Sequence, residues 1–236
     1  MNWTAWAGWL TTFFTAPARR SGPDSIVHRV GEHLTLCGEA LLWSALLAVP
    51  LGLLIGYTGR GAVAVTALTG VARALPTLGL VTLAVLLAGV GDGAVLVPLV
   101  ALAAPPLLVA TVEGIRGTDP ELRDAARGIG LTHRQVLFQV CLPAALPTLI
   151  AGLRSATVQV IATATVAAYV GLGGLGRYVI DGLATRDFPA TVGGALLVVL
   201  LAVAAQLFFS LLLRYGLPPG LRAQRAAGRR SGGPHG

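Results

Sequence analysis

The sequence predicts an all-α membrane protein, and its composition and hydropathy support that prediction. Hydrophobic residues make up 55% of the chain, charged residues only 11%, and the mean hydropathy is +0.77. A spanning helix needs about 20 apolar residues. The apolar runs are continuous rather than alternating with polar residues, which favours helices over a barrel. Five runs have the required length: 36–57, 64–90, 94–114, 146–172 and 190–214.

The N-terminal segment 2–16 is apolar, but at roughly 15 residues it is short for a span. Trp3, Trp6 and Trp9 recur at a helical spacing, which is typical of a helix in the membrane interface. We therefore expect residues 1–32 to be an interfacial segment, with a sixth span as the alternative. A cleaved signal peptide is less favoured, because no basic residue precedes the apolar part.

The basic residues are all arginines, and they predict the orientation of the chain. Basic residues stay on the cytoplasmic side of a bilayer. With five spans, most arginines fall on one side, which places the N-terminus outside and the C-terminus in the cytoplasm. Membrane lipid, rather than nucleic acid, is the expected partner of this charge. The cytoplasmic set is Arg60, Arg116, Arg123, Arg127, Arg134, Arg214, Arg222, Arg225, Arg229 and Arg230, whereas Arg19, Arg20 and Arg29 fall outside and favour the six-span alternative.

Several features argue against chemistry within the chain itself. No lysine is present, so the chain lacks the Walker A residue that reaches nucleotide phosphates. Gly171, Gly173 and Gly176 match the pattern GxGxxG, but they follow an apolar run and therefore predict a tight turn at the outer face. Cys37 and Cys141 are expected to pack in the core. We expect no enzyme activity, no metal and no cofactor.

A polar segment, residues 119–142, separates the third run from the fourth. Asp119 is suited to cap a helix, Pro120 to occupy the first turn, and Glu121 to lie near the positive helix end. These residues predict a first short helix over 120–129.

Gly130 then permits a bend, and Thr132 can cap a second short helix over 133–140, which Pro143 is expected to end. Two short helices joined by a bend would form an elbow that projects from the cytoplasmic face. Such an elbow is a rigid lever, suited to pass motion from a soluble partner into a helix bundle. An ordinary amphipathic surface loop is the alternative.

The same segment resembles the EAA loop of permease subunits of bacterial ABC importers. Asp124-Ala125-Ala126 is followed by Gly130 six residues after Asp124, and Leu142-Pro143 stands twelve residues beyond Gly130. The family usually has Glu at the position of Asp124, so the charge is kept on a shorter side chain. The resemblance covers about residues 33–214. Five stretches are similar to the osmoprotectant branch of these permeases: 73–78, 114–117, 142–147, 151–154 and 171–176.

This resemblance implies a five-helix permease domain over 33–214, followed by a basic cytoplasmic tail, 215–236, which we expect to be disordered. It implies a second permease copy or paralogue, a cytoplasmic ABC ATPase dimer and an extracytoplasmic solute-binding protein, at the bacterial inner membrane. The implied cargo is glycine betaine, choline, carnitine or a similar solute, with methionine importers as the nearest alternative. The residues implied to couple to the ATPase are Asp124, Ala125, Ala126, Gly130, Leu142 and Pro143.

The fourth run offers a candidate translocation pathway. Gln159 and Thr163 lie four residues apart and share a helix face, and Tyr169 follows nearer the outer end. Hydrogen bonding between helices is the alternative role for these polar residues. A secondary transporter or channel would be favoured by inverted repeats and paired acids within the membrane, which we do not find.

Overall fold

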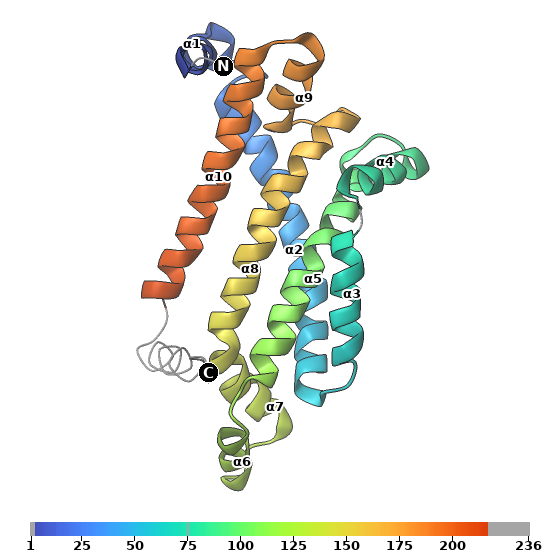
Figure 1. Ribbon diagram of the computed structural model, residues 1–236. Helices are drawn as coiled ribbons and strands as arrows, with labels where there is room; N and C mark the ends of the chain where they lie inside the picture. The colour runs from blue at the N-terminus through green and yellow to red at the C-terminus, as the bar shows by residue number, and fades with distance from the viewer. Residues whose placement is uncertain (1–2, 75, 217–236) are drawn as a thin grey trace, which may run out of the picture.

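A computed structural model describes residues 3–74 and 76–216 of the chain. Within these ranges all regular structure is helical, as predicted. Four of the described helices are long and apolar enough to cross a membrane, and they run side by side in Figure 1. The basic tail expected to be disordered lies outside the described residues from 217 onward. The four are α2 (Ile26–Thr58), α5 (Asp92–Arg116), the helical run His133–Val170 that contains α8 (Leu142–Ala164), and α10 (Phe188–Tyr215).

The second predicted span is broken into two helices. α3 (Ala62–Ala74) and α4 (Thr77–Ala88) meet at Pro76, which precedes the first turn of α4. Proline lacks a backbone N–H and disfavours a helical conformation in the residue before it, so the helix stops there. The span predicted over 64–90 is therefore divided between two helices. In Figure 1, α3 runs along the bundle beside α5, whereas α4 lies across it near the start of α5.

The first long helix starts earlier than residue 36, where the sequence predicted its span to begin. α2 begins at Ile26, and the hydroxyl of Ser25 accepts a hydrogen bond from the backbone N–H of His28. Arg29, whose position did not fit the five-span orientation, therefore belongs to the first turns of this helix. Its guanidinium bonds the carboxylates of Asp24 at 2.7 Å and Glu32 at 2.9 Å. The two carboxylates offset the positive charge of Arg29, which did not fit the five-span orientation.

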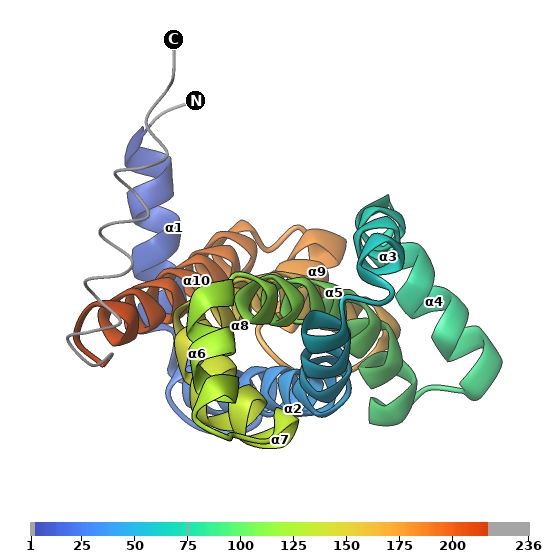
Figure 2. The same cartoon turned by 90° about the horizontal axis from the view of Figure 1, so that it is seen from below.

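The N-terminal helix α1 (Trp3–Thr15) lies across the bundle axis, as the view along the bundle in Figure 2 shows. Its anchor is Phe13, which is only 2% exposed and packs edge-on against the ring of Tyr178. Gly193 of α10 makes room for the Phe13 ring, since a side chain at Gly193 would overlap that ring. The interfacial position of the segment stays a prediction, which this orientation and the length of 13 residues support.

The core of the bundle forms where α2, α5 and α8 cross. Glycines stand at these crossings, because a side chain at Gly52 would overlap Thr111 and one at Gly152 would overlap Ala110. Small residues of this kind let helices approach closely in a membrane, where packing is a main source of association. One buried cluster, in the half of the bundle farther from these crossings, includes Cys37, Ala40, Val81, Val95, Leu99, Ala103, Val160, Ile161, Ala164 and Ala167.

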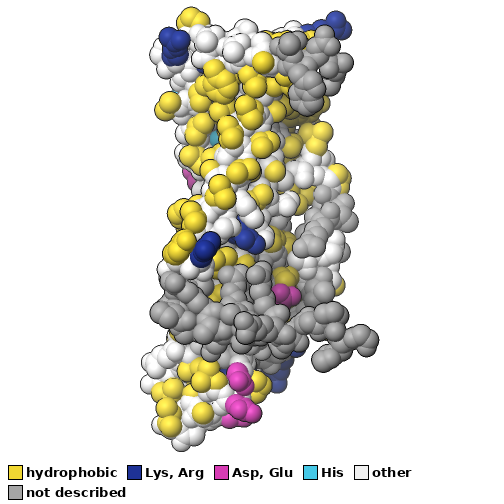
Figure 3. All heavy atoms as spheres, turned by 60° about the vertical axis from the view of Figure 1, so that its left-hand side comes forward, with side chains coloured by type: hydrophobic (Ala, Val, Ile, Leu, Met, Phe, Trp, Pro, Cys, Tyr) yellow, Lys and Arg dark blue, Asp and Glu magenta, His cyan; other side chains and the backbone are white. Residues whose placement is uncertain are grey.

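The outer surface of the bundle is apolar along its length. Figure 3 shows the face on which α10 lies, and hydrophobic side chains cover much of it. Exposed apolar residues recur along this helix, which is the pattern expected of a lipid-facing surface. They are Val199, Leu200, Val203, Leu207, Phe208 and Leu211.

Pro143 does not end the second helix of the elbow, contrary to the sequence prediction. A first turn, α7 (His133–Gln135), continues through a π-helical segment, Val136–Cys141, directly into α8. The wider π turn makes bonds over five residues, as between the N–H of Leu142 and the carbonyl of Leu137. This local change accommodates the proline, which can supply no N–H of its own. The elbow is therefore continuous with a spanning helix.

Candidate functional site: the coupling elbow and the face of α8

The elbow begins with α6 (Pro120–Gly128), and its start follows the predicted chemistry. The Asp119 carboxylate accepts a hydrogen bond from the backbone N–H of Glu121 at 2.9 Å, and Pro120 occupies the first turn. Glu121 lies where the positive end of the helix dipole favours an acid. Figure 1 shows α6 at the end of the molecule opposite α1.

The bend between α6 and α7 depends on Gly130. Its φ of +91° lies in the left-handed region, where a residue with a side chain is strained. Thr132 then caps the next turn as predicted, in a capping box with Gln135. The Gln135 side chain accepts from the Thr132 backbone N–H at 2.8 Å, while the Thr132 hydroxyl accepts from the Gln135 N–H at 3.4 Å. These bonds satisfy backbone donors that the helix itself leaves free.

A small apolar core holds the elbow to the bundle. Ala126 of α6 and Val136 of the π-helical segment are buried against Ile115 of α5, together with Cys141 and Ala145. Because this cluster joins three helices, a force on the elbow reaches α5 and α8 through close packing. Both cysteines occupy buried clusters, in line with the packing role expected of them.

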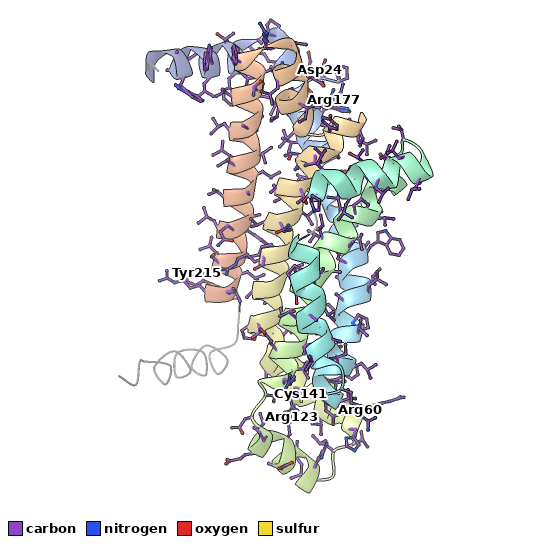
Figure 4. All side chains as sticks on the ribbon, turned by 45° about the vertical axis from the view of Figure 1, so that its right-hand side comes forward. Asp24, Arg60, Arg123, Cys141, Arg177 and Tyr215 are labelled. Carbon is purple, nitrogen blue, oxygen red and sulfur yellow. The ribbon has the colours of Figure 1, made fainter. Side chains whose placement is uncertain are left out.

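Polar contacts support the same attachment. The guanidinium of Arg123 in α6 donates to the backbone carbonyl of Ile115, near the C-terminal end of α5, where helix carbonyls lack partners. The Tyr57 hydroxyl at the end of α2 bonds His133 Nδ1 at 2.9 Å, and Arg127 approaches the same nitrogen at 3.3 Å. Figure 4 places Arg60, Arg123 and Cys141 together at this end of the molecule.

The six predicted coupling residues divide into surface and core positions. Asp124, Ala125 and Gly130 are exposed, so they are open to a docking partner. Ala126 is buried, Leu142 packs against the elbow core, and Pro143 is half-buried at the start of α8. Their role in coupling stays a prediction, and the division indicates that the first three would touch a partner while the others hold the shape of the elbow.

The predicted pathway residues do not all lie on one open face of α8 and the short 3₁₀ helix, Thr165–Val170, that follows it. Ser155, Gln159 and Ala162 are exposed at separations of four and three residues, which places them along one side of α8, and Tyr169 is exposed in the 3₁₀ helix beyond them. Thr163 is buried, and its hydroxyl donates to the carbonyl of Gln159 at 2.9 Å. The pathway stays a prediction, and this arrangement favours Gln159 and Tyr169 over Thr163.

The glycine-rich turn packs at the end opposite the elbow. Gly171 and Gly174 both have a φ of +90°, and the N–H of Gly174 donates to the Glu32 carboxylate at 2.8 Å. A side chain at Gly173 would overlap the same carboxylate. The sequence predicted the turn, but it missed the partner of the turn, because Glu32 is 142 residues away from Gly174.

Charged residues surround that turn at the same end of the bundle. Figure 4 shows Asp24 and Arg177 close to one another there. The hydrogen bond from Arg29 holds the pKa of the Asp24 carboxyl below its ordinary value. Arg19, the second arginine that did not fit the five-span orientation, lies over the rings of Phe13 and Tyr178. Such contacts favour a cation at this position whichever side of the membrane it occupies.

The helical fold is similar to that of chains in solved ABC transporters. The chain superposes on a chain of the MetNI methionine ABC transporter in an inward-facing conformation with a TM-score of 0.70 and 24% identity, over 80% of this chain and 94% of the other. An amino acid ABC transporter gives a TM-score of 0.61 and 17% identity, over 91% and 96%. At these identities the likeness shows the fold alone.

Residues 48–222 match the family described as "Binding-protein-dependent transport system inner membrane component", and the chain belongs to this family. Relatives include the glycine betaine/carnitine/choline transport system permease protein OpuCB of Bacillus subtilis, 32% identical over 85% of this chain and 92% of that protein. The carnitine transport permease protein OpuCB of Listeria monocytogenes is 31% identical over 93% and 98%. The expected resemblance to importer permeases is confirmed.

Proposed function

We propose that this chain is the permease subunit of an ATP-driven importer of quaternary ammonium osmoprotectants. The observation that supports the cargo is its similarity to permeases named for glycine betaine, choline and carnitine, which extends over most of both chains. The likeness to a methionine transporter is a likeness of fold. Glycine betaine, choline or carnitine therefore fits better than methionine as the solute.

The partners follow from the architecture. A cytoplasmic ATPase dimer would dock on the exposed residues of the elbow, Asp124, Ala125 and Gly130, and move α5 and α8 through the buried cluster behind them. A solute-binding protein would deliver cargo at the opposite end, and a second permease copy or paralogue would complete the pathway. ATP hydrolysis belongs to the ATPase, because a chain without lysine has no Walker A residue to offer.

Uptake measurements test the cargo. A bacterial strain that lacks other importers and expresses this chain with its ATPase and binding protein should accumulate labelled glycine betaine or choline when the medium is made hyperosmotic. Methionine is the matched competitor, since it is the cargo named for the structural neighbour. Uptake of methionine without uptake of either quaternary ammonium solute would contradict the proposal.

A further inference from the structure

A cavity of about 250 Å³ opens between α3, α5 and α8, in the half of the bundle nearer the elbow. Its wall carries Glu113 from α5 and Arg154 and Ser155 from α8. Gly152 also borders it, where the close crossing with Ala110 fixes the distance between the two helices. The cavity is smaller than most drug-binding pockets, which suits a small solute.

The two charged side chains of this cavity have opposite signs, and both belong to helices that span the bundle. Charges within a membrane are costly unless they are paired or face a water-filled cavity. Within the described residues no ion pair joins Glu113 to Arg154, and the ion pairs present lie near the opposite end, at residues 24–32 and 177–181. As far as the described side chains show, both charges are therefore available to a third group that enters the cavity.

We propose that this cavity is a solute subsite of the permease and that it takes a zwitterion, with Arg154 at the carboxylate and Glu113 at the quaternary ammonium. The planar guanidinium matches a carboxylate, which it can bind through two parallel hydrogen bonds. A quaternary ammonium carries no N–H, so it needs a nearby negative charge rather than a hydrogen-bond acceptor. This inference rests on the proposed cargo, since glycine betaine and carnitine carry both groups whereas choline lacks the carboxylate.

The position of the cavity agrees with a place on the transport route. Ser155 lies on its wall and also on the exposed side of α8 that continues through Gln159 toward Tyr169. Gln159 is one helical turn from Ser155, so a solute that reaches the cavity along this side would pass the polar side chain of Gln159 before it meets Ser155. At this depth, exposed polar side chains cost more free energy when they face lipid than when they face a solvated path.

The ratio of two solutes tests the charge assignment in whole cells. With all transporter subunits present and solute well below saturation, Arg154→Gln should lower the uptake of glycine betaine relative to choline by about tenfold, because only glycine betaine has a carboxylate for the guanidinium. Arg154→Lys keeps the positive charge and should retain most of the wild-type ratio. Glu113→Gln should lower the uptake of both solutes, because both carry the quaternary ammonium.

The matched control is Arg60→Gln, which removes an exposed arginine at the end of α2 and should leave the ratio unchanged. A wild-type ratio in Arg154→Gln would overturn the subsite while leaving the proposed cargo intact. A wild-type transporter that takes up neither solute would instead overturn the proposed cargo.

Chemical labelling gives an answer even if Arg154→Gln fails to insert. Both native cysteines are buried, so Ser155→Cys provides one reactive thiol on the cavity wall. In the purified permease–ATPase complex, a methanethiosulfonate reagent that carries a trimethylammonium group should label this thiol, and glycine betaine should slow the reaction several-fold. Thr185→Cys, exposed at the opposite end, should react at a rate that glycine betaine does not change. Equal rates with and without glycine betaine at Ser155→Cys would overturn the proposal.

Discussion

Gly130 sets the angle of the elbow through its backbone conformation. No atom lies within 4 Å of the place where a side chain would stand, so the constraint is the φ of +91° and not a clash. Gly130→Val should cost about 1 kcal/mol or more at the bend. We expect protein level and membrane insertion to stay near wild type while ATPase association and transport fall together, as measured by coprecipitation and uptake.

Gly128 supplies the matched control for that prediction. It is also exposed with open space around it, but it belongs to the helix α6 and has no left-handed φ. Gly128→Val should therefore leave ATPase association close to wild type. If both valine variants behave alike, the bend at Gly130 has no special role in coupling.

Asp124 is an exposed acid of the elbow, and the small residues Ala125 and Ala126 follow it directly. A charge-assisted contact that becomes shielded on docking typically contributes about 1.5–3 kcal/mol. Asp124→Ala should accordingly weaken ATPase binding by roughly tenfold to a hundredfold, while Asp124→Glu keeps the charge and should bind well. Binding measurements with purified subunits check this, and normal binding by Asp124→Ala would remove Asp124 from the interface.

At the scale of elements, local chemistry accounts for what the sequence could predict of the elbow. The cap at Asp119, the bend at Gly130 and the cap at Thr132 each depend on residues within a few positions, so the pattern is sufficient. The stop predicted at Pro143 failed because a proline ends a helix only when the neighbouring turns cannot widen. Here the π-helical segment Val136–Cys141 widens, and the burial of its ends against α5 stabilises it.

Contacts between distant elements were beyond the sequence pattern. Glu113 and Arg154 were visible as charges within two apolar runs, but only the rotation of α5 and α8 about their axes brings them to one cavity. The hydrogen bond between the Glu32 carboxylate and the glycine-rich turn likewise depends on how α2 packs against that turn. A hydropathy pattern fixes which residues lie within a helix, not which side of the helix meets which neighbour.

The docking of α1 onto α9 (Gly176–Thr185) and α10 depends on the buried side chain of Phe13. Replacing a buried Phe by Ala commonly costs about 3–5 kcal/mol, and here the loss falls on one short helix. Phe13→Ala should release α1 while the bundle stays folded. In a Trp43→Phe background the three remaining tryptophans, Trp3, Trp6 and Trp9, all belong to α1, and the quenching of their fluorescence by acrylamide should increase. Phe14→Ala is the control, because Phe14 is 41% exposed, and a similar increase in that variant would argue against docking through Phe13.

At the scale of the whole molecule, the two ends differ in charge chemistry. At the elbow end, Arg60, Arg116 and Arg134 are exposed and form none of the ion pairs found among the described residues. At the other end, Arg29 and Arg177 are each paired with acids, so their net contribution to the field there is small. Unpaired basic residues favour the cytoplasmic side. Of the three arginines that did not fit five crossings, Arg29 is paired with two acids, whereas Arg19 and Arg20 form none of the ion pairs among the described residues. The structure thus answers the objection for Arg29 and leaves it standing for the other two.

This asymmetry predicts an orientation with the elbow in the cytoplasm, and the orientation can be measured. Gln135 lies in the elbow, whereas Asp92 begins α5 at the opposite end of the same bundle. Because the native cysteines are buried, single cysteines at these positions can be labelled selectively. In intact cells, Asp92→Cys should react with a membrane-impermeant maleimide, and Gln135→Cys should react only after the membrane is permeabilised. Labelling of Gln135→Cys from outside would overturn both the orientation and the coupling role of the elbow, because an ATPase in the cytoplasm could not reach it. The number of crossings is a separate question, since an even number would put the N-terminus and the C-terminus on the same side.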